Sequence, residues 1–167
     1  VLLVDDFSRP GESALGTSWQ GFTDRVMGGI STMRAGYQQD GDGVVLRMTG
    51  TVSLENNGGF VQVRLPLSAD GSFDASGFTG IALEVRALPG HYYVHLRTGT
   101  TRLPWQYYAA PLDAGPEWQR LEVPFAEFAA ESTRRGLDPS RLASLAVVGG
   151  NHEFDADISV RRIELYR

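Results

Sequence analysis

Residues 80–98 read G-I-A-L-E-V-R-A-L-P-G-H-Y-Y-V-H-L-R-T, and this stretch decides the fold. Within 80–87, and again within 91–98, apolar residues occupy every second position. A Pro-Gly pair at 89–90 marks a turn between the two segments. A period of two is that of a β-strand with one face against a core. The stretch therefore predicts two strands rather than a helix.

The strand pattern recurs along the chain, in Gly59–Leu65, Trp118–Pro124, Leu142–Val148 and Phe154–Tyr166. Leu142–Val148 is almost wholly apolar, which predicts a strand buried on both faces. The last segment changes phase near Arg161 or Arg162, where we expect a β-bulge. Only residues 126–130 and 139–143 look helical, for about one turn each. We predict an all-β, two-sheet antiparallel jelly-roll sandwich, with residues 1–167 forming a single domain.

The composition narrows the chemistry that the domain can perform. It has no cysteine, and all 15 basic residues are arginine, which excludes thiolate, disulfide and lysine chemistry. The formal net charge of −5 argues against nucleic acid as a partner. The apolar run Val1–Val4 is too short for a membrane span. Because the chain does not begin with methionine, it stays open whether a leader or membrane anchor has been removed. The compartment therefore stays open too.

The sequence lacks the usual signs of catalysis or metal binding. It contains no phosphate-binding glycine loop and no nucleophile elbow. His91 and His95 are four residues apart, but on a strand this spacing spans about 13 Å, too far for one ion. Two carboxylate clusters have two interpretations each, as calcium ligands or as solvated strand ends. They are Asp5 with Asp6, and Asp155 with Asp157. We predict no catalytic residue, no metal site and no cofactor.

Two segments carry a more specific signal. Residues 22–31 read F-T-D-R-V-M-G-G-I-S, and residues 50–60 read G-T-V-S-L-E-N-N-G-G-F. Together they resemble the complex I intermediate-associated protein family. The W-Q-Y-Y run at 105–108 and the P-F-A-E-F run at 124–128 fit the same family pattern. The resemblance extends from about Trp19 to Tyr166.

The resemblance implies a galactose-binding-like jelly roll, the fold of many carbohydrate-binding modules, and a role without catalysis. Eukaryotic members of the family are chaperones for assembly of the membrane arm of respiratory NADH dehydrogenase. The expected partner is therefore a protein, such as a subunit of a membrane complex. The compartment stays open, and a cytoplasmic position peripheral to that complex is one alternative. The alternative is a glycan. Many relatives of this fold hold calcium with acidic residues in the last strand, where this chain has Arg161 and Arg162.

The signature residues of this resemblance are Asp24, Met27, Gly28, Gly29, Ser31, Asn56, Asn57, Gly58 and Gly59. We expect the glycines to provide positive φ or close backbone approach, and Asp24 to cap the neighbourhood. We also expect 24–31 to be ordered, with Val26, Met27 and Ile30 packed inward. Maintenance of the fold and direct contact with a partner both remain open as roles.

Strand alternation also predicts a binding surface. If Val61, Val63, Leu65, Tyr92, Val94 and Leu96 face the core, then Gln62, Arg64, Tyr93, His95 and Arg97 face away from it. A following strand over 105–108 would pair as a meander and add Trp105 and Tyr107. We predict that a partner or ligand binds in one groove lined by Arg64, His95, Arg97, Trp105 and Tyr107. The alternative is an ordinary solvated sheet face with Trp105 under a loop.

Overall fold

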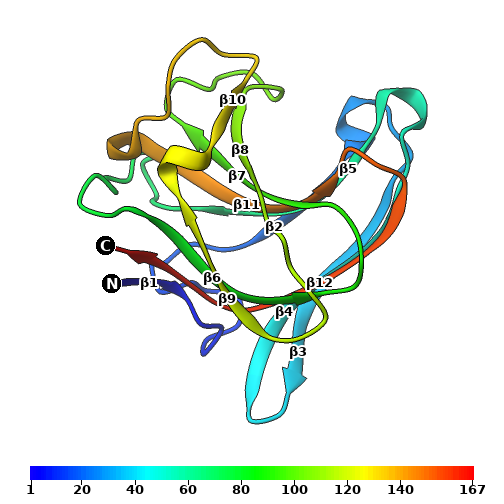
Figure 1. The fold of residues 1–167 in the computed structure, drawn as a ribbon, viewed down its shortest axis with the longest axis horizontal. Coiled ribbons are helices and arrows are strands. Elements are labelled where there is room, and N and C mark those ends of the chain that lie inside the picture. The colour runs from blue at the N-terminus through cyan, green and yellow to red at the C-terminus, as the bar shows by residue number, and fades with distance from the viewer.

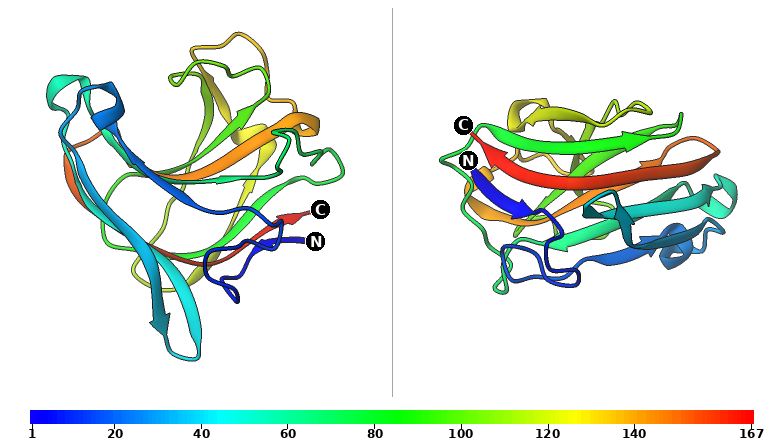
Figure 2. Two further views of the ribbon diagram at one scale, coloured as in Figure 1. Left: turned by 180° about the vertical axis from the view of Figure 1, so that it is seen from behind. Right: turned by 90° about the horizontal axis from the view of Figure 1, so that it is seen from below.

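The computed structural model describes the backbone of residues 1–167 and the side chains of all residues except Met27 and Asn57. It contains two six-stranded antiparallel sheets packed face to face (Figure 1). Figure 2 shows the same two layers from behind and from below, with the two termini side by side. The predicted jelly-roll sandwich is confirmed.

Sheet A consists of β1 (Leu2–Asp5), β3 (Thr32–Asp40), β4 (Gly43–Val52), β6 (Gly80–Ala87), β9 (Gln119–Pro124) and β12 (Phe154–Tyr166). Its order is β3-β4-β12-β6-β9, with β1 paired to β12. Sheet B consists of β2 (Gln20–Thr23), β5 (Phe60–Pro66), β7 (Tyr92–Thr98), β8 (Tyr107–Pro111), β10 (Ala129–Glu131) and β11 (Leu142–Gly150). Its order is β10-β8-β7-β11-β5-β2.

The core lies between the two sheets, and the predicted alternation places side chains in it. The inward residues of β5 and β7 are buried: Val61, Val63, Leu65, Tyr92, Val94 and Leu96. Burial of one such side chain contributes about 1.5–3 kcal/mol, so these two strands alone anchor sheet B firmly. Strand β11 is buried on both faces, as its apolar sequence predicts.

The phase change in β12 is a bulge, as predicted. The register of β12 against β6 shifts between Val160 and Arg162. The extra residue turns both Arg161 and Arg162 away from the core, while Ile163 and Leu165 point into it.

Some elements carry too little apolar signal to be read from the sequence. The long hairpin of β3 and β4 is one, because β3 is an edge strand with mostly exposed side chains. Its turn lies at the D-G-D-G segment of residues 40–43. Four 3-10 turns occur: η1 (Asp24–Met27), η2 (Glu55–Asn57), η3 (Phe125–Glu127) and η4 (Pro139–Arg141). The helical turns predicted at 126–130 and 139–143 match η3 and η4 only in part, because 129–130 belong to β10 and 142–143 to β11. The sequence does not indicate η1 or η2. No helix in the described chain is long and apolar enough to cross a membrane.

Candidate functional site

The outer face of sheet B carries a groove that follows its central strand, β11. Small side chains on the outer face of β11, including Ser144, Ala146 and Val148, alternate with inward apolar ones. Ala146 lies opposite both Arg64 of β5 and His95 of β7 in the ladder. Long side chains from two strands therefore flank a low central strip. Because β11 separates β5 from β7, these strands share a sheet without being direct neighbours.

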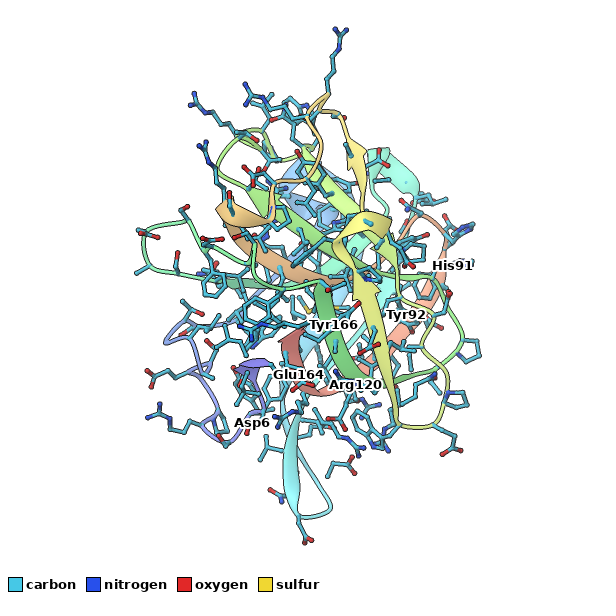
Figure 3. All side chains as sticks on the ribbon, turned by 60° about the vertical axis from the view of Figure 1, so that its left-hand side comes forward. Asp6, His91, Tyr92, Arg120, Glu164 and Tyr166 are labelled. Atoms are coloured by element: carbon cyan, nitrogen blue, oxygen red, sulfur yellow. The ribbon has the colours of Figure 1, made fainter. Side chains whose placement is uncertain are left out.

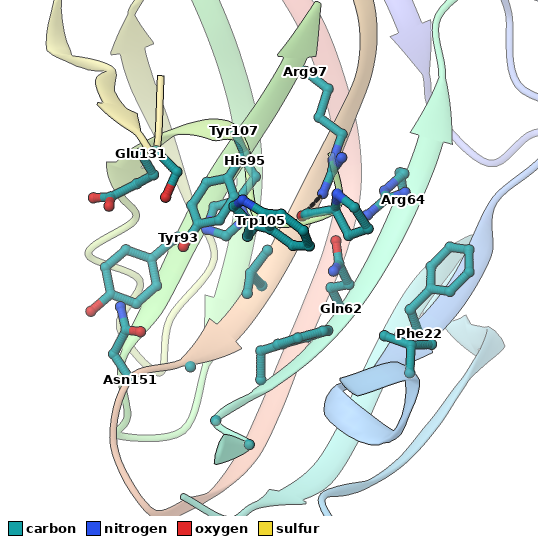
Figure 4. A pocket seen from close by; sticks show the side chains of 18 of the residues that line it. Phe22, Gln62, Arg64, Tyr93, His95, Arg97, Trp105, Tyr107, Glu131 and Asn151 are labelled. Atoms are coloured by element: carbon teal, nitrogen blue, oxygen red, sulfur yellow. Dashed lines mark hydrogen bonds between the residues drawn. The ribbon is translucent and has the colours of Figure 1, made fainter. Parts of the chain in front are cut away.

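The groove has a volume of about 510 Å³ and brings together all five residues predicted to line it. They are Arg64, His95, Arg97, Trp105 and Tyr107 (Figure 4). Strand β8 pairs with β7 as the expected meander, but it begins at Tyr107, so Trp105 lies in the preceding loop and not in the strand. The Tyr107 ring stacks on the imidazole of His95 at 4.1 Å between centroids and 13° between planes. Trp105 stands at the rim with 54% of its surface exposed. Their role in binding stays a prediction.

Two arginines occupy one end of the groove in different ways. Arg97 donates hydrogen bonds to the carbonyl oxygens of Leu103 (3.4 Å) and Pro104, so it fixes the loop that carries Trp105. Arg64 lies with its guanidinium carbon 4.9 Å from the ring centroid of Phe22, a residue of β2. Both guanidinium groups are only partly accessible to solvent.

Burial and positive charge determine the protonation of the groove. Burial, reinforced by Arg97 and Arg64, lowers the pKa of His95 to about 3, so its imidazole is neutral near pH 7. Burial also lowers the pKa of Arg97 to about 10, with a further contribution from Arg64. Burial raises the pKa of Tyr107, and Glu131 raises it further. The groove thus has a neutral aromatic centre with cationic groups at one end.

Sequence reasoning missed several groove residues because their positions depend on strand order. Glu131 enters through β10, where it lies opposite Tyr107. Phe22 enters through β2, which pairs with β5. Asn151 follows β11 and has a left-handed φ of 65°. None of these short elements has a periodic pattern long enough to reveal which strand it joins.

The two signature segments meet at one buried carboxylate. Asp24 accepts hydrogen bonds from the backbone N–H groups of Ser31 (3.0 Å), Gly59 (2.5 Å) and Phe60 (3.3 Å), and from the Ser31 hydroxyl (2.5 Å). The Ser31 oxygen in turn accepts a bond from the N–H of Ser53. Although burial raises the pKa of Asp24, these hydrogen bonds outweigh it and hold the pKa below its ordinary value.

The glycines of these segments have the geometric roles predicted for them. Gly28 has φ of 88° and Gly59 has φ of 136°, both in the left-handed region. A Cβ atom added to Gly29 or Gly58 would lie 2.5 Å from the Asp24 carboxylate. The hydrogen bonds of Asp24 therefore join η1 to η2 at one end of sheet B (Figures 1 and 2). At this end Gly58 and Gly59 line the groove.

One expectation for this region is wrong. Val26 and Ile30 do not pack inward: 67% and 44% of their surfaces are exposed. The segment is held by the polar contacts of Asp24 and Ser31, so it needs no apolar anchor. Asn56 is exposed and has a left-handed φ of 54°, consistent with a turn residue. The expectations for the side chains of Met27 and Asn57 lie outside the described side chains.

The residues considered as metal ligands have other partners. His91 stacks on His152 at 3.7 Å, while His95 stacks on Tyr107. Asp5 accepts a hydrogen bond from the indole N–H of Trp19, Asp155 from the Thr51 hydroxyl, and Asp157 forms an ion pair with Arg47. The described side chains contain no group of three or more histidines and carboxylates placed to hold an ion.

Solved structures with the same fold include carbohydrate-binding modules from Clostridium thermocellum. The family 11 module of a cellulosomal cellulase has a TM-score of 0.77 at 15% identity, covering 98% of this chain and 92% of that module. Another family 11 structure, in complex with a β-1,3-1,4-mixed-linked tetrasaccharide, has a TM-score of 0.75 at 14% identity, covering 99% and 94%. A family 30 module has a TM-score of 0.67 at 14% identity, covering 98% of both chains. At such identities the likeness shows the fold alone.

A search of curated proteins found no match. A protein-family model, in contrast, matches most of the chain. This model, described as complex I intermediate-associated protein 30, covers residues 6–149, including both signature segments and the strands that flank the groove. The chain therefore belongs to the complex I intermediate-associated protein 30 family.

Proposed function

We propose that the chain is a non-catalytic protein-interaction module of the assembly-factor type. Its concave groove on sheet B binds an extended segment of a partner protein. The observation that carries the proposal is the set of aromatic and arginine side chains gathered in one groove: Arg64, His95, Arg97, Trp105 and Tyr107. The family description supports a partner that is an intermediate or subunit of a membrane complex.

The chemistry of the groove suits a polypeptide segment. Its polar groups include the donors Arg64, Arg97 and the indole of Trp105, which can bind carbonyl oxygens of an extended peptide. They also include acceptors such as Gln62 and Asn151, which can bind its N–H groups. Trp105 and Tyr107 supply rigid contact area at low entropic cost, as the anchors of protein interfaces do. A strip flanked by two strands also matches the width of one extended chain.

A second candidate, glycan binding, has a specific observation in its favour. The stacked rings of His95 and Tyr107, with Trp105 at the rim, offer flat apolar surfaces beside planar polar groups. Sugar rings bind to such surfaces. The fold neighbours include carbohydrate-binding modules, and one of these is in complex with a tetrasaccharide.

Site-specific photocrosslinking separates the two candidates. Val26, which is exposed and lines the groove, is replaced by benzoylphenylalanine, and Gln38, exposed on β3 of sheet A, is replaced in a control protein. Each protein is irradiated in an extract of the native cells, and crosslinked proteins are identified by mass spectrometry. A glycan array is probed in parallel with the unmodified chain.

We expect one protein to crosslink at Val26 and not at Gln38. Once purified, that protein should bind the wild-type chain and fail to bind a Trp105→Ala, Tyr107→Ala double variant that melts normally. Equal crosslinking at both positions would overturn the proposal. Groove-dependent binding on the glycan array without a protein partner would favour the second candidate.

A further inference from the structure

The groove is cationic although the chain is acidic. Three arginines line it, namely Arg64, Arg97 and Arg102. Among its described lining residues the one carboxylate is that of Glu131. The chain as a whole has a formal net charge of −5. Positive charge is therefore gathered at this one place against the overall balance of the protein.

Within the groove, the arginines have no carboxylate partner among the described side chains. Arg64 is half-buried, and its guanidinium group lies against the Phe22 ring rather than in an ion pair. Arg97 donates to the neutral carbonyl oxygens of Leu103 and Pro104. A partly desolvated guanidinium gains most from an anion that replaces its lost hydration.

The positive charge is confined to one end. Figure 4 shows Arg64 and Arg97 together on one side of Trp105, with Glu131 beyond Tyr107 on the other side. Glu131 would repel a second carboxylate at its own end. A bound segment is thus oriented, with its negative group beside the arginines.

We infer that the partner segment bound in the groove is acidic, and that one of its Asp or Glu carboxylates pairs with Arg64 beside Arg97. The inference rests on the proposed function and names the chemistry of its partner. A planar carboxylate matches the bidentate donor geometry of a guanidinium, which makes Arg64 a specificity-determining residue.

The test begins with an unbiased library. A display library of random 12-residue peptides is selected on the immobilised full chain, and enriched peptides are measured by fluorescence anisotropy. Each peptide is compared with a version in which Asp and Glu become Asn and Gln. The protein variants are Arg64→Gln and a matched control, Arg34→Gln, which makes the same charge change on the exposed edge strand β3. Thermal melting verifies that both variants fold.

We expect the enriched peptides to share an Asp or Glu and to lose affinity about tenfold or more when it is neutralised. Arg64→Gln should cause the same loss and abolish the difference between the acidic and neutral peptides, whereas Arg34→Gln should bind as wild type. Oligogalacturonate serves as a second anionic probe, of glycan origin.

The possible failures are distinct. Peptides that bind the groove without preference for an acidic residue would overturn the inference and leave the proposed function standing. Selection of no groove-dependent peptide would overturn both. Binding of oligogalacturonate, lost in Arg64→Gln, without any peptide binding would show that the groove takes an acidic glycan instead.

Discussion

The outer faces of the two sheets use the same residue types in opposite ways. On sheet A, arginines pair with carboxylates: Arg47 with Asp157, Arg86 with Asp40, Arg120 with Glu122 and Glu164, Arg161 with Glu84, and Arg162 with Glu164. The pair of Arg120 and Glu164 is visible in Figure 3. On sheet B, the described neighbours of Arg64 and Arg97 include no such partner. These arginines of sheet A are paired with carboxylates, whereas the two groove arginines of sheet B have no such partner among the described side chains.

Two tryptophans, Trp118 near sheet A and Trp105 near sheet B, show the same difference between the faces. Trp118, immediately before β9, contacts the guanidinium groups of Arg86 and Arg161, whose carbons lie 4.8 and 4.5 Å from its ring centroid. Trp105 is half exposed above the groove of sheet B. The Trp118 ring is thus partly covered by cations of its own sheet, whereas Trp105 is more exposed. Both contrasts support the proposed binding surface on sheet B.

The largest effect is expected from Asp24→Ala, which removes the carboxylate that joins the two signature segments. Four hydrogen-bond donors would lose their acceptor in a buried place, so we expect a loss of about 3 kcal/mol or more in the free energy of unfolding. Urea denaturation measures it. Asp155→Ala on sheet A, where the carboxylate is exposed, is the control. A similar cost for both variants would refute the structural role of Asp24.

The next effect concerns binding rather than stability. Replacing Trp105 and Tyr107 by Ala should weaken binding of the crosslinked partner by about 2–3 kcal/mol, because the contact area that both rings make with it would be lost. Isothermal titration calorimetry gives the affinity. Trp118→Ala, on the sheet A side, should leave the affinity unchanged, and an equal loss in that variant would break the contrast between the faces.

Gly28→Val should destabilise the fold by about 1–2 kcal/mol through backbone strain alone. A Cβ at Gly28 would meet no atom within 4 Å, but its φ of 88° is unfavourable for a branched residue. Gly77→Val is the matched control, since Gly77 has open space and no positive φ. Equal melting temperatures of the two variants would show that Gly28 does not serve backbone geometry.

Acidification should destabilise the protein through His95. Its folded pKa of about 3 lies below the ordinary 6.5, so the unfolded chain binds an extra proton between these values. The neutral imidazole makes its full contribution to stability above pH 6.5, and this contribution is lost as the pH falls towards 3. Urea denaturation at about pH 7 and about pH 5 should show a larger decrease for wild type than for His95→Gln. An identical decrease would mean that His95 is freely protonated in the folded state.

The smallest effect is expected on sheet A. Arg47→Gln breaks a partly exposed ion pair with Asp157, so it should cost about 1 kcal/mol or less and leave partner binding intact. Chemical denaturation and calorimetry measure the two quantities. A loss of binding in this variant would place part of the partner surface on the wrong sheet.

The sequence predicts long periodic elements well because burial of one face dictates their pattern. The alternation in β5 and β7 placed Arg64, His95 and Arg97 correctly on the outer face. The position of β11 between these strands is set by pairing over long sequence distances, which periodicity does not encode. The exposure of Val26 is not predictable for a related reason: an apolar residue in a short turn has no periodic pattern, and hydrogen bonds hold that turn.

The central claim is that a ligand binds the outer face of sheet B and not that of sheet A. Amide chemical-shift mapping of the full chain, titrated with the highest-affinity peptide from the display selection, tests it most directly. The account predicts that shifts concentrate in β5, β7, β8 and β11 and in the loop that carries Trp105. Shifts concentrated in β4, β6, β9 and β12 would contradict it.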